Sequence, residues 1–445
     1  MVIDRNQVEL FVSLTPILNG TLENDAHELA QFVKKAELLL VKLPEKFART
    51  HDEQNLAQQI MTACRKIRTQ LLARHADEVY SFLSSDSHSY RSLSDLIFLA
   101  AEKFPFLVPT RAQIESEQKK IQEHKEGYEI DQGIFFRGIL RSPKAGSHLV
   151  DAMLLPSTRA LSLLEVFTAE GQIDLGSVFL QRSGEAAYLT INNQHCLNAE
   201  DNNLINDLQV AVDLVLLEER VKVGVLRGGV MHHPRYKGKR VFCSGINLAE
   251  LQAGKISFVD FLLGREFGYI NKIRHGIINQ DEHETIQKPW VAVVDSHSIG
   301  GGMQMLLVVD KVIAAENVYF SLPAAQEGIV PGAANLRLPH MAGYRLARQM
   351  ILSGKKIYAS DPEARWLCDH TVPTEEIDVA IQAAVEELKN PAVVLNRKML
   401  NLAEEPRERF REYMAEFSYI QAMRLYSDDV LEKISRWAKK EKTSC

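Results

Sequence analysis

The first 175 residues place apolar side chains with the period of amphipathic helices. Between residues 25 and 43 they recur every three or four positions, and two later stretches, the last over residues 93–104, repeat the pattern. Asp25 and Glu28 have the spacing of a capping box, which predicts that the first of these helices begins at Asp25. We expect a helical N-terminal domain over residues 1–175 that serves as a scaffold or in oligomerisation.

The pattern changes after residue 176 to short strands that alternate with helices. Two strand-like stretches flank Ser183-Gly184, which predicts a hairpin. Short, mainly apolar runs follow at residues 221–226, 290–294 and 311–314. Strands that alternate with helices imply βαβ units and a mostly parallel sheet. We therefore expect an α/β core over residues 176–375 and a helical C-terminal region over residues 376–445.

Composition narrows the class of protein without naming a function. Hydrophobic residues make up 46% of the chain, charged residues 25%, and the net charge is -6, which is ordinary for a soluble globular protein and indicates no nucleic-acid or membrane partner. We see no secretory signal and no apolar run long enough to span a bilayer. The five scattered cysteines argue against a disulfide framework or a structural zinc site, so a cytoplasmic location is expected.

Two glycine-rich segments are the first candidates for chemistry. One is FCSGINL, residues 242–248, and the other is SIGGGMQ, residues 298–304. Glycines before a helix let backbone N–H groups approach an anion closely. One donor from each segment would form an oxyanion hole for a thioester carbonyl that becomes an enolate. The plainer interpretation of the triple glycine is a tight strand-to-helix turn. Neither a dinucleotide-binding nor a phosphate-loop motif is present.

Three motifs in order, SGINL, PWVAVVDSHSIGGGMQ and YFSLPAAQEGIVPGAANLRLP, resemble the crotonase, or enoyl-CoA hydratase/isomerase, superfamily over roughly residues 176–375. The resemblance implies a crotonase-like ββα spiral core, trimer-based assembly, and an oxyanion hole made by the N–H groups of Ile246 and Gly301. It also places neighbouring residues of both segments at the CoA thioester: Ser244, Gly245, Asn247, Leu248, Gly300 and Gly302.

Two departures from the superfamily pattern change the expected reaction. Hydratases of this superfamily carry catalytic glutamates where this chain has Gln304 and Ala324. A glutamine amide does not take up a proton as a carboxylate does, and alanine has no polar group. Because water addition needs an acid and a base, it has lost both of its usual agents.

The further segments LNAED, LRGGVMHHPRYKGKRVFCSGINL and VDFLLGREFGYI extend the resemblance over nearly the full length, to a branch of oxygenases in this superfamily. That resemblance implies conversion of 3,5-dihydroxyphenylacetyl-CoA and O2 to 3,5-dihydroxyphenylglyoxylate and free CoA, in the dihydroxyphenylglycine branch of glycopeptide-type antibiotic biosynthesis. It implies no metal or other cofactor, and a homo-hexamer built from two trimers.

The resemblance also implies roles for three polar residues, each with a plainer alternative. Glu200 contacts the aryl end of the substrate or assists proton removal; otherwise it is a carboxylate at a helix N-terminus. Arg265 binds a phenolic oxygen or polarises the ring; otherwise it is a surface ion pair. Gln304 hydrogen-bonds near the reacting carbon or the nascent peroxide; otherwise it is an ordinary helix residue.

A basic stretch before SGINL is the candidate for CoA binding. His233, Pro234, Arg235 and Tyr236 lie in it, and arginine and lysine meet phosphates by charge-assisted hydrogen bonds. A solvated loop is the alternative. Arg397 and Lys398 are either further phosphate contacts or surface residues. The adjacent His232 and His233 lack the pattern of a metal site, so we expect no metal.

Two other functions stay open at this point. One is an ordinary hydratase or isomerase with a relocated acid and base, and Gln304 and Ala324 argue against it. The other is a non-enzymatic CoA-binding scaffold in which the N-terminal helices are the working part. The presence of Glu200, Arg265 and both glycine segments argues against a scaffold.

Overall fold

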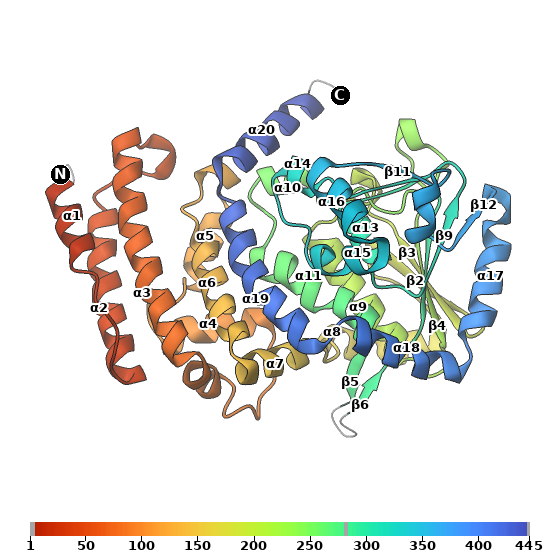
Figure 1. Ribbon diagram of the computed structural model, residues 1–445, viewed down its shortest axis with the longest axis horizontal. Coiled ribbons are helices and arrows are strands. Elements are labelled where there is room, and N and C mark those ends of the chain that lie inside the picture. The colour runs from red at the N-terminus through yellow and green to blue at the C-terminus, as the bar shows by residue number, and fades with distance from the viewer. Residues whose placement is uncertain (1–4, 280–283, 443–445) are drawn as a thin grey trace. The chain divides into compact units, whose positions relative to one another are not determined.

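The computed structural model describes residues 5–279 and 284–442, and their side chains except those of Arg235 and residues 437–442 (Figure 1). The chain forms two compact units, each built from more than one segment. One unit comprises Met1–Ala152, Ala249–Val259 and Arg411–Cys445, and the other comprises Met153–Leu248 and Asp260–Phe410. Among the described residues, no helix is both long and apolar enough to cross a membrane.

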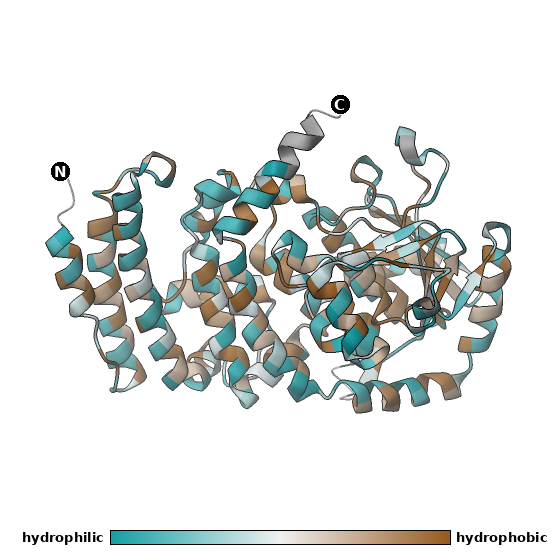
Figure 2. Ribbon diagram, turned by 45° about the horizontal axis from the view of Figure 1, so that its top comes forward, coloured by the Kyte–Doolittle hydropathy of each residue, from teal (hydrophilic) through white to brown (hydrophobic). Residues whose placement is uncertain are grey.

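The first unit is helical, as the N-terminal pattern predicted. Helices α2 and α3 pack along each other, and α3 also packs on α6. Figure 2 shows both apolar and polar residues around these helices, as expected for amphipathic elements. The helices that lie wholly or partly in this unit are α1 (Arg5–Ser13), α2 (Leu22–Leu40), α3 (His51–Leu83), α4 (Leu93–Lys103), α5 (Arg111–Gln118), α6 (Tyr128–Arg141), α7 (Pro143–Ala152), α10 (Leu248–Gln252), α19 (Arg407–Arg424) and α20 (Asp428–Lys442).

The predicted capping box at Asp25 was wrong. Helix α2 begins one turn earlier, where the Thr21 side chain accepts a hydrogen bond from the Asn24 N–H. Asp25 lies inside the first turn and is buried. Its carboxylate accepts from the Gly20 N–H at 2.9 Å and pairs with His75 Nε2 at 2.9 Å. The spacing of Asp25 and Glu28 resembled a cap, but the tertiary partner of Asp25 is 50 residues away.

The Asp25–His75 pair predicts a pH-dependent stability. Burial opposes the charge on His75, but its hydrogen bonds to the carboxylates of Glu78 and Asp25 raise its pKa. Burial likewise opposes the charge on Asp25, but His75 and the Gly20 N–H lower its pKa. The His75 contribution is therefore complete below its usual pKa of about 6.5 and is lost as the pH rises through the raised value. The Asp25 contribution is present above about pH 4 and is lost as the pH falls.

We expect His75→Gln to lose about 1 kcal/mol of stability near pH 6 and to differ less from the wild type at pH 9. Thermal unfolding of both proteins across this range measures the difference. His51→Gln, at an exposed position of the same helix, is the matched control. A constant difference between His75→Gln and the wild type at every pH would contradict the assignment.

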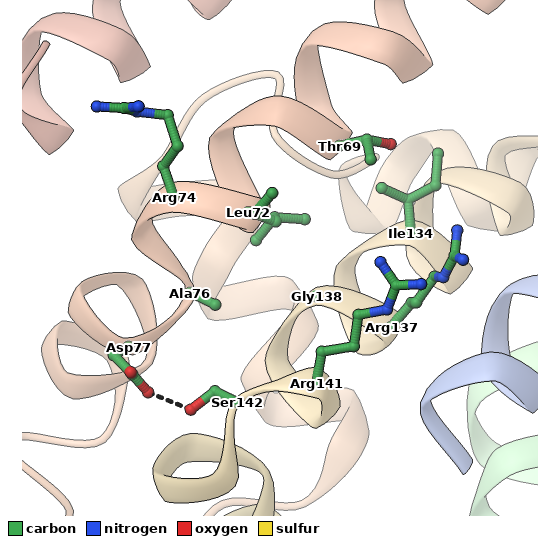
Figure 3. A pocket seen from close by; sticks show the side chains of 11 residues that line it. Thr69, Leu72, Arg74, Ala76, Asp77, Ile134, Arg137, Gly138, Arg141 and Ser142 are labelled. Atoms are coloured by element: carbon green, nitrogen blue, oxygen red, sulfur yellow. Dashed lines mark hydrogen bonds between the residues drawn. The ribbon is translucent and has the colours of Figure 1, made fainter. Parts of the chain in front are cut away.

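The first unit contains a pocket of about 330 Å³ between α3 and α6 (Figure 3). Leu72 and Gly138 lie at its wall, where a Cβ on Gly138 would be only 2.6 Å from Leu72 Cβ. Arg137 and Arg141 at its edge both pair with Glu416. No residue with a predicted role lines this pocket.

The second unit contains a seven-stranded sheet in the order β1-β2-β3-β4-β7-β9-β12. The strands from β3 to β12 run parallel, and β1, β2 and β3 are antiparallel, which confirms the predicted hairpin and mostly parallel sheet. The strands are β1 (Gln172–Asp174), β2 (Val178–Ser183), β3 (Ala186–Ile191), β4 (Val223–Gly228), β7 (Trp290–Val294), β9 (Lys311–Ala315) and β12 (His370–Val372). Every residue of β7 and β9 is buried, which explains why, apart from Lys311, their sequences are apolar.

A second sheet in this unit has three strands in the order β11-β10-β8, and a third has two strands, β5 and β6. These strands are β5 (Ile277–Asn279), β6 (Glu284–Ile286), β8 (His297–Ile299), β10 (Tyr319–Ser321) and β11 (Ile357–Tyr358). Strand β8 leads directly into α13 and so positions the triple glycine. The helices of this unit are α8 (Thr158–Glu170), α9 (Asn202–Leu217), α11 (Gly264–Phe267), α12 (Tyr269–His275), α13 (Gly301–Leu306), α14 (Ala324–Glu327), α15 (Ala334–Ala342), α16 (Tyr344–Ser353), α17 (Ile377–Leu388) and α18 (Pro391–Glu404).

Candidate active site

The two glycine-rich segments lie side by side. Cys243 forms a parallel bridge with Ser298, and the Ile299 N–H donates to the Cys243 carbonyl at 3.0 Å. A Cβ on Gly245 would lie 3.8 Å from the Gly301 nitrogen, so the residue before Ile246 lies beside Gly301. The segments bend where Gly245 and Gly300 have φ values of +87° and +54°, a region that favours glycine. The two sequence motifs therefore form one structural feature.

The N–H groups of Ile246 and Gly301 are two backbone donors that are available in these neighbouring segments. Gly301 is the first residue of α13, where N–H groups have no partner within the helix. Among the described residues, neither the Gly301 N–H nor the Ile246 N–H donates a hydrogen bond. Gly301 is buried and Ile246 is half-buried. Two donors without a partner are what the predicted oxyanion hole requires, and their convergence on one oxygen atom stays a prediction.

Glu200 is attached to the same feature through its backbone. Its N–H donates to the Gly245 carbonyl at 2.7 Å, and its carbonyl accepts from the Asn247 N–H at 2.8 Å. Its carboxylate is 1% exposed and lies over Gly301, where a Cβ would be only 1.6 Å from Glu200 Oε2. The N-cap of α9 is the next residue, Asp201, whose side chain accepts from the Leu204 N–H. Capping of α9 is thus done by Asp201, and the Glu200 carboxylate lies beside a predicted oxyanion donor.

Arg265 is the centre of a buried polar cluster, not a surface ion pair. Its Nε donates to Glu200 Oε1 at 2.8 Å, and one terminal nitrogen donates to the Gly301 carbonyl at 2.7 Å. The other terminal nitrogen donates to Glu266 Oε1 at 2.6 Å and to Gln304 Oε1 at 2.8 Å. One guanidinium therefore connects three of the side chains and the backbone of the triple glycine. Glu200 lies just before the N-cap of α9, Arg265 and Glu266 lie in α11, and Gln304 lies in α13, helices that are labelled in Figure 1.

Two members of this cluster were not predicted from the sequence. Tyr269 donates its hydroxyl to Glu200 Oε1 at 2.8 Å, and Glu266 Oε2 accepts from the Ala333 N–H at 3.0 Å. Both lie in the GREFGYI segment that carries Arg265. Gly268, with φ of -89° and ψ of -116°, separates α11 from α12, so the spacing of four residues between Arg265 and Tyr269 was no signal of this contact. Gly332 closes the cluster, because a Cβ there would lie 2.1 Å from Glu266 Oε1.

Burial and neighbouring charges shift the pKa values of Arg265, Tyr269 and Cys243. Burial opposes the charge on Arg265, yet the adjacent Glu200 and the other anionic partners raise its pKa well above the ordinary value. Burial and the nearby carboxylate of Glu200 raise the pKa of Tyr269, so its hydroxyl remains a donor. Burial also raises the pKa of Cys243, whose thiol stays protonated and packs against Gly302.

The predicted CoA-binding stretch lies close to the same segments. Tyr236 packs edge-on against His297, with ring centroids 5.5 Å apart, while His233 and Pro234 are exposed. Ser244, Gly245, Asn247 and Leu248 continue from it, and the side chain of Arg235 lies outside the described residues. Phosphate contact by this stretch stays a prediction.

Arg397 is neither a phosphate contact nor a surface residue. It is 4% exposed, and its guanidinium donates to Asp310 at 2.7 Å and to backbone carbonyls of α12, including that of Arg274 at 2.9 Å. These contacts hold α18 against α12, and the guanidinium charge of Arg397 is paired with Asp310 within the second unit. Lys398 is exposed, which agrees with the alternative that it is a surface residue.

One group of potential metal ligands occurs among the described residues. Ligand atoms of His195, Cys196 and Asp201 lie within 4.8 Å of one another. The Asp201 carboxylate is already used, because one oxygen caps α9 and the other accepts from Asn193 Nδ2 at 2.9 Å. His232 and His233 are both exposed.

The comparisons with known proteins assign the class. The pattern of the enoyl-CoA hydratase/isomerase family matches residues 181–442, and the chain belongs to this family. The chain is 50% identical over 426 residues to the (3,5-dihydroxyphenyl)acetyl-CoA 1,2-dioxygenase of Amycolatopsis orientalis, covering 95% of this chain and 98% of that protein. It is 26% identical over 234 residues to the short-chain-enoyl-CoA hydratase of Clostridium acetobutylicum, covering 52% of this chain and 82% of that protein.

Among solved structures, OdaA of Pseudomonas aeruginosa is similar with a TM-score of 0.50 and 21% identity, over 59% of this chain and 98% of that one. The predicted crotonase-like α/β fold with a helical N-terminal region is confirmed.

Proposed function

We propose that this protein converts 3,5-dihydroxyphenylacetyl-CoA and O2 to 3,5-dihydroxyphenylglyoxylate and free CoA. The observation that carries the proposal is the buried Glu200–Arg265–Gln304 cluster against Gly301, within a chain that is 50% identical over almost all of its length to a protein with that activity in its name. The proposed reaction uses neither metal nor flavin, because the substrate enolate supplies the electrons.

The first proposed step is removal of a proton from the α-carbon of the thioester. The ring and the thioester both acidify this C–H bond. The Ile246 and Gly301 N–H groups hold the thioester oxygen and stabilise the enolate, an effect of roughly 3–4 kcal/mol for each donor in comparable sites. Glu200 is the proposed base, because Arg265 and Tyr269 occupy its Oε1 and leave Oε2 beside Gly301.

The second step brings in O2. The enolate passes one electron to triplet O2, which avoids the spin barrier, and recombination forms a peroxide at the α-carbon. The peroxide attacks the thioester carbonyl, the C–S bond breaks, and CoA leaves as the thiolate. Cleavage of the O–O bond, with loss of the remaining α-hydrogen as a proton, gives the keto acid. Both oxygen atoms enter the product. Gln304 is the proposed hydrogen-bond partner of the peroxide.

The residues at the two hydratase positions argue against water addition. Gln304 is held through its Oε1 by Arg265 at 2.8 Å, and Ala324 is buried and apolar. Neither position supplies an acid or a base. For the assembled enzyme we propose a homo-hexamer of two trimers, with His233, Pro234, Arg235 and Tyr236 among the CoA contacts.

An O2-electrode assay tests the proposed function. Metal-free protein with 3,5-dihydroxyphenylacetyl-CoA is expected to consume one O2 for each CoA released. Under anaerobic conditions in D2O, the same thioester is expected to exchange its α-protons without releasing CoA. An enoyl-CoA serves as the control substrate and should not be hydrated. Anaerobic hydration of the enoyl-CoA without O2 uptake on the arylacetyl thioester would assign the protein to the hydratases instead.

A further inference from the structure

One side-chain hydrogen bond joins the two glycine-rich segments. The Ser244 hydroxyl, two residues before Ile246, lies 3.0 Å from Nε2 of His297, four residues before Gly301. The same hydroxyl donates to the Leu197 carbonyl at 2.8 Å, three residues before Glu200. Ser244 thus contacts the segments that carry both oxyanion donors and the proposed base.

The direction of these hydrogen bonds follows from counting protons. A serine hydroxyl has one hydrogen, and a carbonyl oxygen only accepts. The hydrogen of Ser244 therefore points to Leu197, and His297 Nε2 must carry the hydrogen of the other bond. The bonds run from His297 to Ser244 to Leu197. A His297 ring that is protonated on Nδ1 alone would leave two acceptors facing each other.

The Leu197 carbonyl, the last acceptor in this series of hydrogen bonds, belongs to a strained piece of backbone. Leu197 and Asn198 have φ values of +53° and +56°, in the left-handed region. This conformation costs a residue with a side chain roughly 1–2 kcal/mol and persists only where neighbours hold it. Asn198 is held by its own amide, which donates to the Ile191 and Val241 carbonyls at 3.0 and 2.7 Å. Leu197 is held through its carbonyl by Ser244.

The His297 ring, which is the first donor in this series of hydrogen bonds, is fixed by packing. His297 is 3% exposed. Its ring stacks on Tyr319 with centroids 5.6 Å apart and meets the edge of Tyr236 at 5.5 Å. The orientation of Nε2 is therefore set by two aromatic neighbours.

We propose that His297 and Ser244 are positioning residues for the reaction. Their hydrogen-bond chain holds the segments of Gly301, Ile246 and Glu200 in one register, so that both amides and the carboxylate face the same thioester. This inference rests on the proposed function, because the oxyanion hole that it aligns is part of that proposal.

The test compares Ser244→Ala, His297→Phe and the double variant. His297→Phe keeps an aromatic ring against Tyr319 and removes the donor. Each single variant is expected to lower kcat for O2 uptake on the order of 10- to 100-fold, as small misplacements of reacting groups do, with little change in KM. Anaerobic α-proton exchange should fall by the same factor. The double variant should be no slower than the slower single variant, because both changes break one chain.

Two further variants make the result specific. Ser296→Ala is the matched control, because among the described residues its hydroxyl has no partner, and its kinetics should equal the wild type. His297→Gln retains a side-chain N–H donor and should recover part of the lost rate. Melting temperatures of all variants separate loss of fold from loss of register.

Wild-type kcat in Ser244→Ala, or fully multiplicative losses in the double variant, would overturn the positioning role. Failure of the proposed function gives a different result, in which the wild type itself consumes no O2. In that case the positioning role is still decided by the α-proton exchange rates of the variants.

Discussion

Arg265→Met is expected to abolish turnover and to destabilise the protein at the same time. O2 uptake and anaerobic proton exchange should each fall by roughly 100- to 1,000-fold, the range seen when an oxyanion-stabilising group is lost. The physical reason is that the buried side chains of Glu200 and Glu266 would lose the cation with which both pair. Leaving a buried charge unpaired costs about 3–5 kcal/mol of unfolding free energy.

Arg337→Met is the matched control for this prediction. Arg337 is also buried in the second unit, where it pairs with Glu405 at 2.8 Å. Its replacement should cost similar stability, while the folded fraction keeps most of its kcat. Equal losses of kcat per folded molecule in both variants would mean that Arg265 contributes only to the fold.

Gly301→Ala should have the second-largest effect. A methyl group at this position would overlap Glu200 Oε2 at 1.6 Å and its carboxyl carbon at 2.6 Å. Because Glu200 is held by Arg265 and Tyr269, it cannot move without breaking the cluster. We expect kcat to fall by at least about 100-fold, with a smaller change in affinity for free CoA measured by calorimetry.

Gly184→Ala separates this effect from the general cost of replacing a glycine. A Cβ on Gly184 would have no atom within 4 Å, although its φ of +59° favours glycine. The variant should lose about 1 kcal/mol of stability and retain its activity. If Gly301→Ala kept wild-type kcat, the close approach of Glu200 to Gly301 would have no catalytic meaning.

The sequence alone was sufficient for much of the fold and for part of the site. Apolar runs predicted β7 and β9 because strands buried on both faces contain few polar residues. The family resemblance carried by the ordered motifs led to Glu200, Arg265, Gln304 and the two amides, and the structure places the three side chains in one cluster.

What the sequence did not predict depends on contacts between distant segments. Glu266 has its role only because α11 packs against Gly301 and Gly332, and Tyr269, at the start of α12, only because it contacts Glu200. Neither periodicity nor spacing contains those contacts. Arg397 shows the same limit, since its partner Asp310 is 87 residues away. The predicted N-cap of α2 was wrong for the same reason, because the Asp25 side chain pairs with the distant His75 while Thr21 caps the helix.

The path of the chain through the two units limits how this enzyme can be divided. After Leu248 the backbone leaves the unit that holds Ile246, contributes Ala249–Val259 to the helical unit, and returns before Arg265. Gly254 lies so close to Lys120 that a Cβ there would be 2.1 Å from its carbonyl oxygen, and Leu251 and Phe258 are buried. A shortened gene for the catalytic half would retain this loop without the helices that receive it, so the helical half cannot be removed as a simple appendage.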